Sequence, residues 1–217
     1  METQATRDAI LLATLPNIPF DGWTDHALRN GARAAGCDQA TVERVFPGGV
    51  PELFEHFSAW ADRAMEQAMA TREQSTQTLR TRLVLALRLR LEQLAPYREA
   101  LRHGVAYAAL PQNAARAAKM VYRTVDSVWY AVGDRATDFS FYTKRGLLSA
   151  VVIATQLYWL ADESEEFQGT WDFIERRVSQ VTDAGRTVSK LGSFSACFSQ
   201  IPSPVRFARQ LRRRLAH

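Results

Sequence analysis

Five arginines near the end of the chain have the spacing needed to bind an anionic surface. On a helix with about 100° per residue, four apolar residues of this segment fall on one side and the arginines on the other. The arginines are Arg206, Arg209, Arg212, Arg213 and Arg214, and the apolar residues are Phe207, Ala208, Leu211 and Leu215. Each basic side chain near an anionic bilayer contributes roughly 1 kcal/mol. We therefore predict an amphipathic membrane-binding helix over 204–217, with a solvated basic tail or a nucleic-acid-binding arm as alternatives.

The histidines do not have the spacing of a catalytic or metal site. They are His26, His56, His103 and His217, and none has Asp or Glu three residues before it. A di-iron carboxylate bundle needs Glu-x-x-His on two helices. The sequence also lacks G-x-S-x-G, HExxH and a nucleotide-binding glycine loop. Glu99 and His103 lie one turn apart, as a solvated pair would. We expect no enzymatic activity, no catalytic residue, no metal and no cofactor.

Helical periodicity recurs along the whole chain, and no alternating strand pattern is evident, so the expected fold class is all-α. Pro51, Pro96 and Pro111 stand where the first turn of a helix tolerates a missing N–H. The expected helices lie near 4–14, 23–35, 38–45, 51–72, 76–94, 97–109, 112–132, 138–161, 165–189 and 204–216.

Charge and composition differ between the beginning and the end of the chain. The first sixty residues hold four arginines and eight acidic residues, whereas the residues from 185 onward hold seven basic residues and no acid. Residues 190–203 are rich in Ser, Gly and Pro, as a flexible tether is. We predict an N-terminal helix-turn-helix-like region over 1–72, a helical bundle over 73–189, a tether over 190–203 and the amphipathic helix over 204–217.

Three short helices followed by a long one is the order of a TetR-type helix-turn-helix domain. A version that reads DNA needs basic side chains facing phosphates. The segment 38–45 offers Arg44 against Asp38 and Glu43. A net negative face repels the duplex whose counterion release normally drives binding. The sequence therefore predicts a degenerate helix-turn-helix that binds no nucleic acid.

The expected helix 112–132 carries charged residues, a methionine and large aromatics within three turns. This combination is typical of protein-contact hot spots, although Trp129 and Tyr130 would also suit the core of a central helix. The candidate partner-binding residues are Arg116, Lys119, Met120, Asp126, Trp129 and Tyr130.

A second set of residues recurs at apolar helical positions over 112–189. Such residues line either a lipid pocket or an ordinary packed core. A cavity large enough for an isoprenoid tail would distinguish the first interpretation from the second. The candidate lipid-binding residues are Val121, Val125, Leu147, Val151, Ala154, Leu157, Tyr158, Trp171 and Ile174.

Nothing in the sequence predicts export or a membrane span. Its start has no apolar stretch of a signal peptide and no transit-peptide pattern. Cys37 and Cys197 lie far apart, which fits a reducing compartment. The longest apolar run, 146–161, is too short and too polar to cross a bilayer. We expect a cytoplasmic, bacterial-type chain that is peripheral on the inner membrane.

From about residue 5 to residue 180, a series of short motifs resembles one family. The chain is similar to the ninth coenzyme-Q biosynthesis protein, a TetR-like lipid-binding accessory family of ubiquinone biosynthesis. The motifs are Pro19-Phe-Asp-Gly-Trp23, Phe46-Pro-Gly-Gly49, Ala109-Leu-Pro-Gln-Asn113, Thr124-Val-Asp126 with Trp129, Gly133-Asp134, Thr137-Asp138-Phe139, Tyr142-Thr-Lys-Arg145, Tyr158-Trp-Leu-Ala-Asp162-Glu-Ser164 and Thr170-Trp171.

The resemblance implies a lipid-binding protein that is not itself an enzyme. It implies an isoprenoid or phospholipid tail in the bundle, membrane association through a C-terminal amphipathic helix, and presentation of a polyprenyl quinone intermediate to a di-iron hydroxylase. Asp126, Trp129 and Tyr130 match the family's docking patch for that hydroxylase. TetR-like proteins commonly dimerise through their last helices, so a homodimer is expected. A ligand-responsive TetR-type repressor and a scaffold that binds no lipid are the alternatives.

Overall fold

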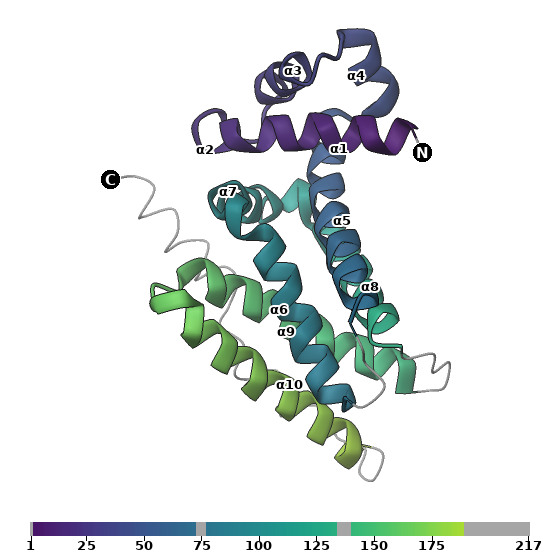
Figure 1. Cartoon of the computed structure of the whole chain (residues 1–217), viewed down its shortest axis with the longest axis vertical. Helices are drawn as coiled ribbons and strands as arrows, with labels where there is room; N and C mark the ends of the chain where they lie inside the picture. Colours follow the sequence, from purple (N-terminus) through teal and green to yellow (C-terminus); the bar gives the residue numbers. More distant parts are fainter. Residues whose placement is uncertain (1, 73–76, 134–139, 189–217) are drawn as a thin grey trace. The chain divides into compact units, whose positions relative to one another are not determined.

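The computed structural model describes residues 2–72, 77–133 and 140–188, which form helices joined by short connections (Figure 1). The described ranges contain no strand, so the all-α prediction is confirmed for them. The predicted tether and the amphipathic helix over 204–217 lie outside the described residues. So do the candidate membrane-binding residues of that helix, which are its five arginines with Phe207, Leu211 and Leu215. The helices are α1 (Glu2–Thr14), α2 (Ile18–Asp21), α3 (Asp25–Ala34), α4 (Gln39–Val45), α5 (Gly49–Ala70), α6 (Leu79–Leu94), α7 (Arg98–Ala108), α8 (Ala114–Ala131), α9 (Ser140–Ala161) and α10 (Gln168–Val188).

The helix boundaries differ from the sequence prediction mainly around residues 15–21. There the proline-rich segment forms a short 3-10 turn, η1 (Leu15–Asn17), and then α2. Pro16 and Pro19 occupy early positions of these two elements, where a missing N–H costs no helical hydrogen bond. Helical φ/ψ values at Thr14, Asn17 and Ile18 carry the backbone from α1 into α2.

The contacts within the chain divide it into two compact units that interleave along the sequence. The N-terminal unit comprises residues 1–61 and 94–120, and the C-terminal unit comprises 62–93 and 121–217. This division differs from the predicted boundary between residues 72 and 73. The reason is that α5 and α8 are long helices, and each begins in one unit and ends in the other.

In the N-terminal unit, α1 packs against α3 and α4, and α2 packs against α7. Trp23 lies edge-on to Phe54, with ring centroids 4.9 Å apart, and its indole N–H donates to the carbonyl of Ala100 at 3.1 Å. Gly104 leaves the space that this aromatic pair fills, because a Cβ there would lie 2.4 Å from Cε2 of Phe54. The Trp23 motif therefore fixes the loop before α3 to α7.

The side chains of Thr24 and Asp38 cap α3 and α4. Thr24 accepts a hydrogen bond from the backbone N–H of Ala27, and Asp38 accepts one from Thr41 at 2.9 Å. Hydrogen bonds from Thr41 hold the pKa of Asp38 below its ordinary value. These caps satisfy donors that the first turn of a helix leaves open.

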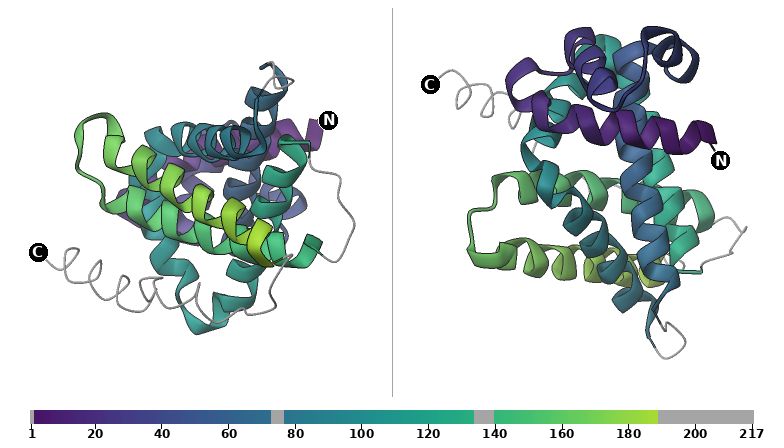
Figure 2. Two further views of the ribbon diagram at one scale, coloured as in Figure 1. Left: turned by 90° about the horizontal axis from the view of Figure 1, so that it is seen from below. Right: turned by 45° about the horizontal axis from the view of Figure 1, so that its top comes forward.

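In the C-terminal unit, α10 runs beside α9, as both views of Figure 2 show. Leu148, Trp159 and Leu160 of α9 are fully buried, and most of the other side chains between residues 147 and 160 are buried or half-buried. This burial explains why residues 146–161 carry no charge, because a helix covered on several sides needs no polar face. Among the described residues, no helix combines the length and apolarity that crossing a bilayer requires.

Candidate partner-binding site on helix α8

Helix α8 has one exposed and one buried face within the C-terminal unit. Tyr122 is 49% exposed and Tyr130 is 76% exposed, and Arg123 and Asp126 are exposed between them. These four residues, which we call the α8 surface, recur at three- and four-residue spacing and so lie along one side of the helix. Thr124, Val125, Val128 and Trp129 of the same helix are buried.

A buried polar cluster holds the inner face of α8. The guanidinium Nε of Arg90 on α6 lies 2.7 Å from Oδ1 of Asp62 on α5, and both side chains are 6% exposed. Thr124 of α8 donates to the same carboxylate at 3.0 Å and accepts from Arg90 at 3.3 Å. Arg90 also donates to the side-chain oxygen of Gln156 on α9 at 3.3 Å. The cluster therefore ties four helices together beneath the α8 surface.

An ion pair fixes one edge of the α8 surface to α9. Arg145 donates to Oδ1 of Asp126 from Nη2 at 2.6 Å and from Nε at 3.2 Å. The two residues come from different motifs of the family resemblance. The structure thus brings the two motifs together, since one supplies the carboxylate and the other its cation.

The six predicted partner-binding residues differ in how far they are exposed to solvent. Tyr130, Asp126 and Lys119 are exposed, and Met120 is half-buried. Arg116 is exposed and pairs with Glu55 of α5 within the N-terminal unit.

Trp129 is only 3% exposed, and this corrects the prediction that it is a docking residue. One residue along the helix turns the side chain by about 100°, which places Tyr130 outside and Trp129 in the core. Sequence reasoning also missed Tyr122, whose signal was its position four residues before Asp126 and eight before Tyr130.

The nine predicted lipid-binding residues lie mostly within the packed interior of the C-terminal unit. Val125 and Ile174 are fully buried, whereas Tyr158 is 38% exposed. Leu147, Val151, Ala154 and Leu157 are also buried, and Val121 and Trp171 are half-buried. A pocket of about 460 Å³ in this unit is lined by none of the nine but by Arg80, Asp172, Glu175, Arg176, Ser179, Gln180 and Asp183. The lipid pocket therefore stays a prediction.

The turn between α9 and α10 is built around Asp162. Its carboxylate accepts hydrogen bonds from the backbone N–H of Ser164 at 2.9 Å, and from the N–H and hydroxyl of Thr170 at 2.8 and 2.5 Å. Burial raises the pKa of Asp162, but the hydrogen bonds from Thr170 and Ser164 outweigh it, so the pKa lies below the ordinary value. The motif from Tyr158 to Thr170 therefore has a structural role in joining these helices.

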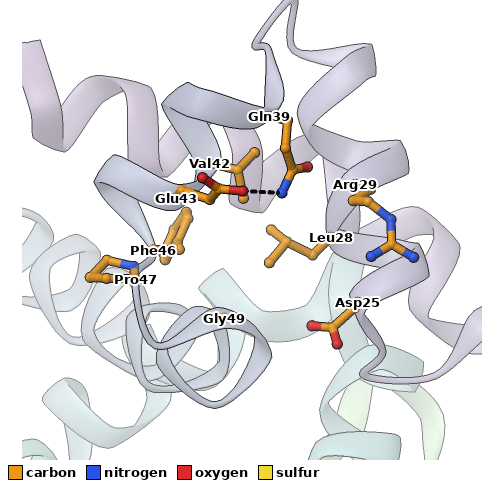
Figure 3. A pocket seen from close by; sticks show the side chains of 9 residues that line it. All are labelled: Asp25, Leu28, Arg29, Gln39, Val42, Glu43, Phe46, Pro47 and Gly49. Carbon is orange, nitrogen blue, oxygen red and sulfur yellow. Dashed lines mark hydrogen bonds between the residues drawn. The ribbon is translucent and has the colours of Figure 1, made fainter.

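Figure 3 shows a pocket of about 320 Å³ between α3, α4 and the start of α5 in the N-terminal unit. Leu28, Val42 and Phe46 line it with buried apolar side chains, and its exposed charged residues are two acids and one base, Asp25, Glu43 and Arg29. The side-chain amide of Gln39 donates to Glu43 at 3.0 Å, so two polar groups of α4 are bonded to each other. Acidic groups in this position disfavour contact with phosphates.

The described histidines lie apart from one another. His56 is buried with its Nε2 2.7 Å from Asp8, while His26 is exposed with its Nδ1 3.5 Å from Asp21. Within the described ranges, no three His, Cys, Asp or Glu side chains gather closely enough to hold a metal ion.

Comparison with known proteins gives consistent similarities. Residues 114–185 match the COQ9 family model. The chain is 31% identical over 195 residues to the mitochondrial ubiquinone biosynthesis protein COQ9 of Homo sapiens, covering 85% of this chain and 60% of that protein. It is 30% identical over 203 residues to the COQ9 protein of Drosophila melanogaster, covering 92% of this chain and 62% of that protein. The chain thus spans about 60% of the length of the curated relatives it matches.

Among solved structures, a TetR transcriptional regulator from Nitrosomonas europaea superposes with a TM-score of 0.66 and 20% sequence identity. The match covers 82% of this chain and 98% of the regulator. This likeness confirms the TetR-like fold and, at such low identity, extends no further than the fold.

Proposed function

Because residues 114–185 match the COQ9 family model and the chain is similar to curated COQ9 proteins, we propose that the protein is an accessory factor of ubiquinone biosynthesis. In this proposal it binds a polyprenyl quinone intermediate, or a phospholipid, and presents it to the di-iron hydroxylase of the pathway. The chemistry belongs to the hydroxylase, and this chain supplies binding and orientation. The protein acts as a peripheral membrane protein and as a homodimer.

The α8 surface is the observation that carries the proposal. It lies inside the segment that matches the family, and it exposes two tyrosines beside Arg123 and Asp126. Tyr and Arg are enriched at protein interfaces, so their exposure together on one side of a helix favours a docking role. Tyr130, with 76% of its surface exposed, is the anchor that we propose for the hydroxylase.

The buried cluster beneath α8 supports the same role. Thr124 and its partners hold the helix by its inner face, which leaves the outer face preorganised for a partner. A rigid aromatic surface loses little side-chain entropy on binding, because few rotatable bonds remain to be ordered.

Pulldown of the purified hydroxylase tests the α8 surface. We expect Tyr130→Lys to reduce capture at least tenfold with an unchanged circular dichroism spectrum, because the substituted side chain is exposed. Phe20→Lys is the matched control, since Phe20 is an exposed aromatic residue in the other unit. Trp129→Lys is unsuitable, since it would bury a charge in the core. Full capture by Tyr130→Lys would refute this docking surface.

Lipid binding and membrane association have separate tests. Native mass spectrometry of the purified chain should detect a co-purifying isoprenoid or phospholipid, and a protein free of lipid would count against the pocket. Co-sedimentation with anionic vesicles should capture the full chain and leave a version that ends at residue 200 in solution. Equal sedimentation of the two would contradict membrane docking by residues 204–217.

A further inference from the structure

The pocket between α3, α4 and the start of α5, which we call the α3–α4 pocket, has no part in the proposed function (Figure 3). All the residues that line it belong to the N-terminal unit. Its volume is about 320 Å³, near the lower end of the roughly 300–1,000 Å³ that is typical of small-molecule sites. The pocket therefore suits a ligand about as large as a single amino acid.

The apolar wall of the α3–α4 pocket is held in place by the surrounding structure. Leu28, Val42 and Phe46 are each at most 5% exposed. The guanidinium of Arg7 lies 4.7 Å above the ring of Phe46, and His56 lies edge-on to the same ring with centroids 5.6 Å apart. A wall fixed in this way loses little conformational entropy on binding, so it can accept an apolar group without rearranging.

Three exposed charged residues line the same pocket, Asp25 and Arg29 from α3 and Glu43 from α4. Glu43 accepts a hydrogen bond from Gln39 at 3.0 Å, whereas Asp25 and Arg29 make no hydrogen bond or ion pair with any other described residue. Figure 3 shows the side chains of Asp25 and Arg29 on the same side of the pocket, opposite Glu43. The pocket thus offers a carboxylate and a guanidinium one helical turn apart.

Gly49 leaves space beside the carboxylate of Asp25. Its φ of +61° lies in the left-handed region, and its backbone N–H donates to the carbonyl of Phe46 at 2.8 Å. A Cβ at this position would lie 3.6 Å from Oδ1 of Asp25. The motif from Phe46 to Gly49, which belongs to the family resemblance, therefore supplies both a turn and part of the lining of the pocket.

The charges restrict which ligand fits the α3–α4 pocket. A simple anion would be repelled by Asp25 and Glu43, and a simple cation would be repelled by Arg29. A neutral apolar molecule would remove water from these charges without giving them a partner. A zwitterion with an apolar body satisfies all three features, because its ammonium and its carboxylate each form charge-assisted hydrogen bonds.

We infer that the α3–α4 pocket binds a free apolar amino acid. The side chain of the amino acid packs against Leu28, Val42 and Phe46, its ammonium binds Asp25, and its carboxylate binds Arg29. The two charged groups of an amino acid share one carbon atom, which lets them reach two side chains one helical turn apart. The inference goes beyond the proposed function, because it gives the degenerate helix-turn-helix a ligand of its own and does not depend on the α8 surface.

Isothermal titration calorimetry of the full-length protein with L-phenylalanine measures this binding. Phenethylamine lacks the carboxylate of phenylalanine and hydrocinnamate lacks its ammonium, while both keep the aromatic ring. Each should bind at least about tenfold more weakly, because it leaves one charged side chain of the pocket without a partner. Glycine keeps both charges and has no apolar body, so it should also bind at least about tenfold more weakly.

Substitutions in the pocket test the two charge contacts separately. Asp25→Asn should weaken L-phenylalanine binding roughly fivefold or more and should not weaken hydrocinnamate binding, which lacks the ammonium. Arg29→Gln should weaken L-phenylalanine binding to a similar extent and should not weaken phenethylamine binding, which lacks the carboxylate. Glu165→Gln is the matched control, since it replaces an exposed acid of the C-terminal unit, and it should bind like the wild type. Circular dichroism checks the fold of each variant.

Amide NMR spectra recorded during the titration locate the site. Shifts in α3, α4 and the start of α5 would support the inference, and shifts confined to the C-terminal unit would overturn it. Phenethylamine that binds as tightly as L-phenylalanine would also overturn it, as would the absence of saturable binding at millimolar concentrations. Tyr130→Lys should bind L-phenylalanine like the wild type, so a failure of hydroxylase capture and a failure of amino-acid binding are distinguishable.

Discussion

Replacing Asp62 with alanine should lower the free energy of unfolding by about 3–5 kcal/mol, because it leaves a buried guanidinium without its counter-charge. Asp62 and Arg90 are each only 6% exposed, with 2.7 Å between Oδ1 and Nε. The substitution also removes the acceptor of the Thr124 hydroxyl, which donates to both carboxylate oxygens. Domains are stabilised by about 5–15 kcal/mol in total, so the loss is a large fraction.

Urea denaturation followed by circular dichroism measures this loss, and a thermal melt should show a decrease of about 2–4 °C per kcal/mol. The matched control is the double variant Asp62→Leu with Arg90→Met, which removes both charges together. We expect it to be far closer to the wild type than Asp62→Ala, since apolar replacements of buried pairs are often neutral. Thr124→Val should cost about 1–3 kcal/mol through the lost hydrogen bonds.

Two results would refute the reasoning about the buried cluster. One is an Asp62→Ala variant within about 1 kcal/mol of the wild type, which would mean that water or another group replaces the carboxylate. The other is a double variant whose loss equals the sum of the single losses, since residues that interact show non-additive effects.

Three further predictions address other parts of the molecule. The pKa of Asp162 is lower in the folded state than its ordinary value of 3.8, so the ionised carboxylate stabilises the folded protein at any pH above 3.8. This stabilisation is lost as the pH falls through the pKa of the folded state. In an acid titration, the free energy of unfolding of the wild type should therefore fall more steeply than that of Asp162→Asn. Gly104→Ala should lower the free energy of unfolding, measured in urea, by about 1–3 kcal/mol, because the added Cβ would lie 2.4 Å from Cε2 of Phe54. An unchanged denaturation midpoint would show that the Phe54 ring moves to make room for it. Arg145→Gln should change the free energy of unfolding by less than about 1 kcal/mol, since its partner Asp126 is 56% exposed, and a larger loss would make the ion pair a structural element.

The sequence by itself determined the helices, because helical periodicity and punctuation by proline, glycine and capping residues are local properties. It located the start of α8 through the proline at 111. It also predicted the resemblance to one family, since a series of motifs in a fixed order is specific even where single motifs are not. The acidic front and the basic end follow from composition alone.

Only the tertiary structure showed which side of each helix is exposed to solvent. Hydrophobic periodicity cannot predict the exposed side of a helix when both sides are apolar or both carry charged residues. Trp129 and Tyr130 are adjacent aromatic residues, yet only the folded structure shows that Trp129 is buried and Tyr130 is exposed. Asp62 and Arg90 have the sequence signature of solvated charges, and the long-range contact between α5 and α6 makes them a buried pair. The exposure of Leu12 and Phe20 is likewise known only from the folded structure, because the buried residues Ile10, Leu11, Leu15 and Ile18 alone would satisfy the pattern of an amphipathic helix.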